Sequence, residues 1–249
     1  MVLLAASCAA PQTLREPPAP PPTAAAADQA GNRLEALAQT GERFCTADGS
    51  WCLDADALTY TADGSVRSLE IVDPDQERGV WPFAVFVGPN NDHALFGVTA
   101  IERQMFSGGG ASSTTLTLYE AVSHSTAVEP VLAVPLESSA LVRACFGESD
   151  IRDRLEACHD EYSFIAALNL APDTTSGHPR FVYVAEAATY PGPLSLTEDS
   201  SRAAPLRRSD LVWARNDACS FRRIMVLNED AAHYMPIEPM PDCPDFLRP

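Results

Sequence analysis

Short apolar segments separated by turn residues constrain the fold of this chain more than any other feature. About ten such segments have the length and the alternating or continuous apolar pattern of β-strands. Turn signals such as Gly88-Pro89-Asn90-Asn91 and Pro191-Gly192-Pro193 lie between them. The pattern predicts a mainly β protein, an antiparallel sandwich or barrel, with strands over residues 66–72, 80–87, 93–101, 114–122, 131–136, 141–146, 162–170, 181–187, 211–214 and 221–227.

Two segments have helical character instead. From about residue 28 to residue 40, Leu34, Leu37 and Ala38 recur at helical spacing, and Gly41 follows as a stop signal. Residues 149–158 place Ile151, Leu155 and Cys158 on one helical face. We therefore expect one or two short helices beside the strands.

The composition of the first residues changes at about position 28. Residues 9–27 are rich in Pro and Ala, which favours an extended tether without a packed core. From residue 28 to residue 249 there is no interdomain linker and no internal repeat. We expect residues 1–8 to be a signal-like segment, residues 9–27 a tether and residues 28–249 a single globular domain.

Cysteine usage indicates an oxidising compartment. Apart from Cys8 the chain has six cysteines, an even number that is typical of disulfides, although six allow 15 connectivities. Pairing sequence neighbours is the simplest hypothesis, and it joins Cys45 to Cys52, Cys145 to Cys158 and Cys219 to Cys243. Zinc thiolate ligation is the alternative, but the chain has no Cys-x-x-Cys pair.

The start of the chain, Met1-Val2-Leu3-Leu4-Ala5-Ala6-Ser7-Cys8, resembles a bacterial lipoprotein signal. In that family the cysteine that matches Cys8 becomes the acylated N-terminus. Ala5 stands where the family prefers Leu, and no basic residue precedes the apolar run, so we expect that the true start codon lies upstream of Met1. The resemblance implies a periplasmic or outer-membrane protein of a Gram-negative bacterium, anchored to the membrane through a lipid on Cys8, and a plain secretory leader is the alternative.

The charge of the chain excludes several functions. All 17 basic residues are Arg, so chemistry that needs a lysine ammonium is absent from this sequence. The formal net charge of -17 argues against a nucleic-acid partner, because polyanion binding depends on clustered cations. No segment has the roughly 18 consecutive uncharged apolar residues of a membrane span.

Cys158-His159-Asp160-Glu161-Tyr162 is the densest group of reactive side chains. With Ala144-Cys145-Phe146 it resembles a stretch of uncharacterised exported proteins of Gram-negative bacteria, a group with no assigned activity, so no role transfers. His159 with Asp160 or Glu161 would suit acid–base chemistry. Consecutive residues usually point in different directions, however, and an ordinary connection between a helix and a strand also explains them.

Ser107-Gly108-Gly109-Gly110-Ala111-Ser112-Ser113 offers a nucleophile loop or an anion-binding nest as hypotheses. It lacks the Gly-x-Ser-x-Gly order of a nucleophile elbow, so a connection between two strands is the simpler interpretation. A hydrolase with a site near Ser107–Ser113 and His159 is therefore an alternative function.

Metal ligation has weak support in the sequence. The histidines at positions 93, 124, 159, 178 and 233 show no metal-ligand spacing, and we predict no metal site and no cofactor from them. Two acidic clusters have the oxygen ligands that calcium prefers; they are Asp48, Asp54 and Asp56, and Asp73, Asp75 and Glu77. Neither cluster matches an EF-hand loop, so only their composition favours calcium. A calcium-binding envelope domain is a third alternative.

A local excess of arginine interrupts the acidic chain between residues 202 and 223. The candidate contacts for an anionic partner are Arg207, Arg208, Arg222 and Arg223. Salt bridges within the protein are the alternative use of these side chains.

The sequence thus predicts an exported, lipid-anchored, disulfide-stabilised β domain. Since no nucleophile motif is present, we expect an interaction or structural module of the envelope, with an envelope protein or a polysaccharide as partner, rather than an enzyme.

Overall fold

In the computed structural model, the described residues are 26–54, 56–62, 65–70, 77–90, 92–123, 128–192, 194–228 and 230–247. The strands in these ranges are β1 (Ala26–Ala27), β2 (Arg33–Ala36), β3 (Ala38–Thr40), β4 (Arg43–Cys45), β5 (Trp51–Leu53), β6 (Ala57–Ala62), β7 (Ser65–Glu70), β8 (Glu77–Phe86), β9 (His93–Phe106), β10 (Gly109–Val122), β11 (Glu129–Arg143), β12 (His159–Leu170), β13 (Phe181–Tyr190), β14 (Ala214–Arg215), β15 (Phe221–Asn228) and β16 (His233–Pro236). The helices are α1 (Glu148–Asp153) and α2 (Pro244–Leu247), with two 3-10 turns, Ser200–Arg202 and Arg208–Asp210. The prediction of a mainly β, sandwich-like fold with antiparallel pairing is confirmed.

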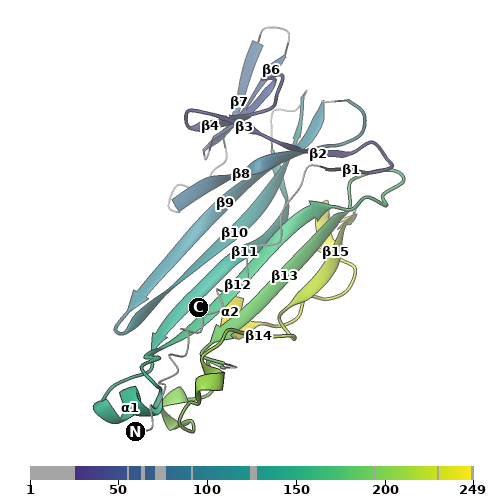
Figure 1. The fold of residues 1–249 in the computed structure, drawn as a ribbon. Coiled ribbons are helices and arrows are strands. Elements are labelled where there is room, and N and C mark those ends of the chain that lie inside the picture. Colours follow the sequence, from purple (N-terminus) through teal and green to yellow (C-terminus); the bar gives the residue numbers. More distant parts are fainter. Residues whose placement is uncertain are drawn as a thin grey trace, which may run out of the picture.

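Two antiparallel sheets organise the described residues (Figure 1). The large sheet has the order β1-β2-β8-β9-β10-β11-β12-β13-β15-β16, and β14 pairs with β13. The small sheet has the order β3-β4-β5-β6-β7. Nearly every connection in both sheets joins neighbouring strands, as the short turn-bounded segments predicted.

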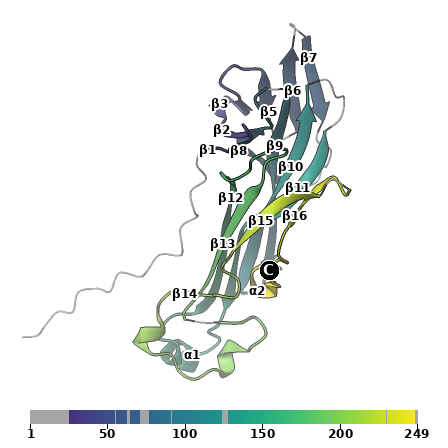
Figure 2. The same ribbon diagram turned by 90° about the vertical axis from the view of Figure 1, so that its right-hand side faces the viewer.

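The long strands pair fully at one end of the large sheet and separate at the other. β11 pairs with β12 only from Glu137 to Arg143, and the register of β10 against β11 shifts between Thr114 and Thr115 and again between Leu118 and Tyr119. Bulges of this kind bend a strand and increase its twist. The free halves of β9–β11 and of β12–β13 therefore diverge into two layers, as Figure 2 shows.

The main core fills the space between these two layers. Leu95, Leu116 and Leu118 from β9 and β10 are at most 1% exposed, and they share this core with Phe181 and Tyr183 of β13. Burying side chains of this size stabilises a protein by roughly 1.5–3 kcal/mol each relative to full exposure. The divergent end of the sheet is therefore a packed sandwich.

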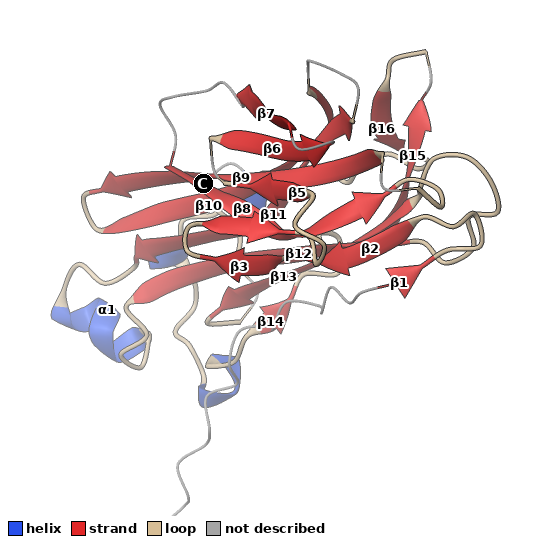
Figure 3. Cartoon of the chain, turned by 90° about the horizontal axis from the view of Figure 1, so that it is seen from above, coloured by secondary structure: helices blue, strands red, loops and turns tan. Residues whose placement is uncertain are grey.

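A second core lies under the small sheet. Trp51, Leu53 and Leu58 of β5 and β6 pack with Phe86 and Phe96 of the large sheet. In Figure 3, seen from above, α1 lies at the periphery, away from β5 and β6. The small sheet thus covers the side of β8–β10 that faces away from the main core.

The prediction of a helix over residues 28–40 is wrong, because this segment forms β2 and β3. Leu34 lies in the main core and Leu37 lies in the second core, on opposite sides of the large sheet. Their three-residue spacing arises because the chain leaves β2, donates the Leu37 backbone N–H to the Pro82 carbonyl, and enters the small sheet.

The second predicted helix exists but is shorter than residues 149–158. α1 ends at Asp153, and Leu155 and Glu156 adopt positive φ angles of 51° and 70°. This left-handed turn brings Cys158 back beside the end of β11, where the Ala144 N–H donates to the Cys158 carbonyl. Ile151 and Leu155, predicted to share one helical face, are 43% and 39% exposed.

Three disulfides join the described cysteines, and each joins sequence neighbours: Cys45–Cys52, Cys145–Cys158 and Cys219–Cys243. The first links β4 to β5, the second fastens the loop that contains α1, and the third ties the segment before β15 to the segment before α2. The disulfide hypothesis is confirmed.

Candidate functional site

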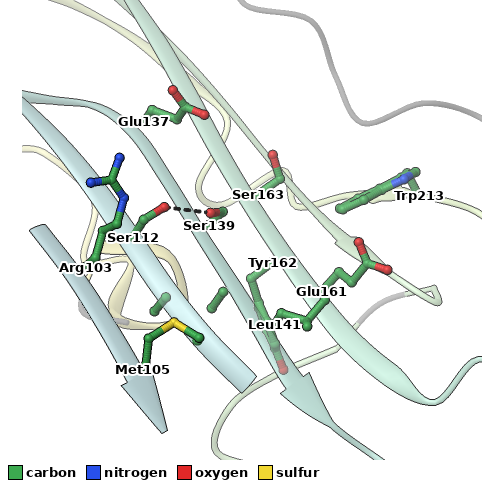
Figure 4. A pocket seen from close by; sticks show the side chains of 13 residues that line it. Arg103, Met105, Ser112, Glu137, Ser139, Leu141, Glu161, Tyr162, Ser163 and Trp213 are labelled. Carbon is green, nitrogen blue, oxygen red and sulfur yellow. Dashed lines mark hydrogen bonds between the residues drawn. The ribbon is translucent and has the colours of Figure 1, made fainter. Parts of the chain in front are cut away.

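A groove of about 530 Å³ crosses the open face of the large sheet at its fully paired end (Figure 4). Its floor is a row of short side chains. Ser112 pairs with Ser139 in the register of β10 and β11, and Ser139 pairs with Ser163 in the register of β11 and β12. Residues that pair directly point to the same face of a sheet, so three hydroxyl groups stand side by side across three strands. The Ser112 and Ser139 hydroxyl oxygens lie 3.0 Å apart, within hydrogen-bond distance.

Taller side chains from the adjacent rows form the walls. On one side the register aligns Met105, Leu141 and Glu161, and Trp213 lies beyond Glu161 (Figure 4). The Trp213 ring packs beside Tyr190 with 5.8 Å between ring centroids. Glu137 lines the opposite side of the groove, so the walls combine carboxylates with apolar surface.

Arg103 closes the end of the serine row at β9, where it pairs with Ser112. Its guanidinium group forms an ion pair with Glu77 of the neighbouring strand β8. The charge that Arg103 brings to the groove is therefore balanced within the protein, while Glu137 and Glu161 leave the groove acidic.

The glycines of the Ser107–Ser113 segment lie in a tight hairpin beside the groove and do not form a long loop. Only Ser107 and Gly108 form a turn, with Gly108 at φ +98°, and β10 begins at Gly109. A Cβ on Gly109 would lie 1.9 Å from the Leu141 carbonyl oxygen, and one on Gly110 would lie 2.8 Å from the Met105 sulfur. The glycines permit a tight hairpin and close packing of its neighbours, so this segment is neither an extended nucleophile loop nor an anion nest.

The candidate polar site His159-Asp160-Glu161 is divided by strand alternation. Asp160 is 4% exposed and points to the covered face, where it forms a buried ion pair with Arg154. His159 is exposed and Glu161 lines the groove. The structure therefore does not bring the three side chains together.

His159 also lies away from the serines of the groove. It is four residues before Ser163 on β12, which corresponds to about 13 Å along the strand. Among the residues that line the groove in the described chain, none is a histidine. The groove serines thus have no imidazole base beside them.

Tyr162 borders the groove only with its backbone side. It is 4% exposed, and its ring packs against Phe246 of α2 on the covered face. Burial, with the charge of Asp160 as a smaller cause, raises the pKa of the Tyr162 hydroxyl well above its usual range. The phenol therefore stays neutral.

The four arginine candidates have separate environments. Arg222 and Arg223 are consecutive in β15 and point to opposite faces. The Arg223 guanidinium donates to the Pro239 carbonyl and lies 3.8 Å from a Glu238 carboxylate oxygen. Arg207 and Arg208 are exposed at the start of a 3-10 turn. Arg223, at least, is used inside the protein.

The described residues of the acidic clusters serve local turns and ion pairs. The Asp48 carboxylate accepts hydrogen bonds from Thr46 and Ser50, and the Thr46 bond is the main cause of a lowered Asp48 pKa. Asp54 accepts from the N–H groups of Asp56 and Ala57, whereas Asp73 and Asp75 lie outside the described residues. Glu77 pairs with Arg103 as described above.

A histidine–glutamate cluster at the other end of the same sheet was missed from the sequence. His93 of β9 and Glu120 of β10 approach through their side chains, and His178 joins them from the β12–β13 connection. These residues are separated by dozens of positions, so sequence spacing carried no signal for them. Only the antiparallel register, which pairs His93 with Val122 and Leu95 with Glu120, places them together.

No family model, curated protein or solved structure matches the chain. The fold and the groove therefore define only a class, a disulfide-linked, sandwich-like β domain with a groove on one open sheet face. Cys8 and nearly all of the tether lie outside the described residues. In the described part of the chain no helix has the length and apolar character needed to cross a membrane.

Proposed function

We propose that the protein is an exported, lipid-anchored module of the bacterial envelope that binds an uncharged polysaccharide in the groove of its open sheet face. The observation that carries this proposal is the row of serine hydroxyls between walls that hold carboxylates and an indole ring. Export and anchoring rest on the signal-like residues up to Cys8, and disulfides suit the same compartment.

The chemistry of the groove suits a sugar chain. Hydroxyl groups of Ser112, Ser139 and Ser163 both donate and accept hydrogen bonds, and the carboxylates of Glu137 and Glu161 accept them from sugar hydroxyls. Trp213 offers an apolar ring face for the C–H side of a sugar ring. A few placed polar groups beside apolar surface are typical of ligand sites.

The orientation of the groove favours an extended chain. The serine row runs across the strands, and adjacent strands are about 4.8 Å apart, so the distance from β9 to β13 is about 19 Å. β10, β11 and β12, which carry the serine row, are each paired on both sides in this region, so a peptide could not add a strand between them. A polysaccharide needs no free strand edge.

The charge of the protein limits the kind of polysaccharide. The formal net charge is -17, and the carboxylates of Glu137 and Glu161 line the groove. A polyanion would be repelled, because the one arginine lining the groove in the described chain is paired with Glu77. We therefore favour an uncharged chain over an acidic one.

Affinity electrophoresis through gels that contain soluble polysaccharides, with pull-down on insoluble ones, tests this proposal. We expect at least one uncharged polysaccharide to retard the wild-type protein. Trp213→Ala removes the stacking surface and Ser139→Tyr fills the groove floor, and each should weaken binding about tenfold or more.

Ser209→Tyr is the matched control, because it adds the same ring at an exposed position away from the groove. It should bind like wild type. Retention by none of the uncharged polysaccharides, equal binding by all three variants, or a preference for acidic chains or basic peptides in the same groove would each overturn the proposal.

The anchor is tested separately. Labelled palmitate should be incorporated into the protein expressed with a complete export signal, and Cys8→Ser should abolish the label and release the protein from the membrane fraction. Unchanged membrane association of Cys8→Ser would contradict lipid anchoring.

A further inference from the structure

The cluster of His93, Glu120 and His178 lies at the end of the sandwich opposite to the groove. His93 and Glu120 are diagonal neighbours on the face of β9 and β10 that also carries Leu95 and Leu118. His178 reaches them from the connection between β12 and β13, in the other layer. Three side chains with nitrogen and oxygen donors thus meet where the two layers of the main core end.

The donor atoms lie close together. His93 Nε2 is 2.5 Å from Glu120 Oε1, and His178 Nδ1 is 4.0 Å from the same oxygen. All three candidate ligand atoms lie within 4.8 Å of one another. In a tetrahedral zinc site with bonds of about 2.0–2.1 Å, ligand atoms are about 3.3 Å apart. The observed distances bracket this value, so small side-chain rotations would complete the geometry.

One donor of the cluster has no hydrogen bond. His178 Nδ1 is buried and lacks a hydrogen-bond partner among the described residues, although 36% of the side chain is exposed. An unsatisfied buried polar atom is costly in a folded protein unless something binds it. This nitrogen is directed toward Glu120, which is where a shared cation would be held.

The Glu120 carboxylate interacts with both histidines. The hydrogen bond with His93 is the main cause of a lowered Glu120 pKa, and the charges of His93 and His178 contribute. The Tyr234 hydroxyl is buried nearby and also lacks a hydrogen-bond partner among the described residues.

We propose that His93, Glu120 and His178 bind one divalent transition-metal ion, with zinc as the best-fitting probe and a water molecule as the fourth ligand. Two imidazoles and one carboxylate are a common set of protein ligands for such ions, whereas calcium prefers oxygen ligands alone. The bound ion would join β9 and β10 to the β12–β13 connection and so hold the two layers together at the divergent end of the sandwich. This site is separate from the groove, and the proposal does not depend on the polysaccharide.

Isothermal titration of the untagged full chain with Zn²⁺, after treatment with a chelator and dialysis, tests the site. We expect one ion per chain, and we expect Zn²⁺ at about 100 times its Kd to raise the Tm by roughly 5–10 °C. Ca²⁺ at the same concentration should leave the Tm unchanged. Co²⁺ should give the visible absorption of a low-symmetry four-coordinate site.

Two variants and one control separate metal binding from folding. The buried Nδ1 of His178 forms no hydrogen bond with the described residues, so the fold should survive the His178→Ala substitution. Zinc affinity should fall by about 100-fold or more, because one ligand is lost. Glu120→Gln should lose the Co²⁺ spectrum. His159→Ala changes an exposed histidine on β12 and should bind zinc like wild type.

Several results would overturn the site. They are the absence of zinc binding at micromolar concentrations by the folded wild-type chain, equal zinc affinity of wild type and His178→Ala, and an equal Tm increase with Ca²⁺. Loss of zinc binding in His159→Ala would equally show that another set of ligands is responsible.

Discussion

The two ends of one sheet face, on the same strands β9, β10 and β11, carry opposite kinds of residues. At the divergent end Leu95, Leu116 and Leu118 are at most 1% exposed and pack against the other layer. At the paired end the same face carries Ser112 and Ser139 and remains open as the groove. In β10 only three residues lie between Ser112 and Leu116.

The register shift between Thr114 and Thr115 lies at the boundary between these two ends. On the apolar side of it β11 leaves β12, and its face turns toward the second layer. On the polar side β9 to β13 remain paired with one another, and the described residues leave the face open as the groove. The bulge thus divides a single sheet face into a packed core and an open groove.

The paired end depends on its covered face for stability, and the buried pair of Arg154 and Asp160 lies there. Asp160→Ala should destabilise the protein by about 3–5 kcal/mol, because the Arg154 guanidinium would remain buried without its partner. Denaturant unfolding monitored by circular dichroism measures this effect.

Asp217→Ala is the control, since this carboxylate forms an exposed ion pair with Arg215. It should change stability by less than about 1 kcal/mol. Equal effects of the two substitutions would show that the pair below the groove is not buried in solution.

The divergent end should respond strongly to loss of apolar volume. Leu118→Ala should cost about 2–5 kcal/mol, because the side chain is 0% exposed between the two layers. The Tm should fall by roughly 2–4 °C for each kcal/mol. A loss below about 1 kcal/mol in calorimetry would mean that the layers do not enclose a packed core.

These strands also show what the sequence could predict. Residues 131–136 and 141–146 were predicted as two strands, but β11 is continuous from Glu129 to Arg143. The polar residues between the predicted strands, Glu137, Ser138 and Ser139, break the apolar pattern because two of them face the groove. An interruption that suggested the end of a strand was therefore part of the candidate site.

The groove and the histidine cluster had no equivalent signal. Ser112, Ser139 and Ser163 are ordinary residues until the register of three strands aligns them. The same is true of His93 and Glu120, which meet only across a hairpin of two long strands. That His159 and Asp160 point apart was expected because consecutive residues usually diverge, although they were predicted to lie in a connection and β12 in fact begins at His159. Pairing between strands, in contrast, was not available from periodicity.

The disulfide that fastens α1 to the paired end should have a moderate effect. Replacing Cys145 and Cys158 together by Ser removes a bond that spans 13 positions, and the chain-entropy relation gives a loss of about 3 kcal/mol as an upper estimate. Because neither cysteine lines the groove, polysaccharide binding should persist once the variant is folded. Unfolding curves and affinity electrophoresis of the same preparation check both statements.

The smallest effect on stability is expected in the groove floor itself. Ser139→Ala removes a hydroxyl that is exposed and that forms a 3.0 Å contact with Ser112, so we expect a change within about 0.5 kcal/mol. The same substitution should weaken polysaccharide binding, since a partner in the hydrogen-bonded row is lost. A residue selected for the core would show the reverse, a large loss of stability with no change in binding. Measured together with Leu118→Ala, this variant therefore tests whether one sheet face really serves stability at one end and recognition at the other.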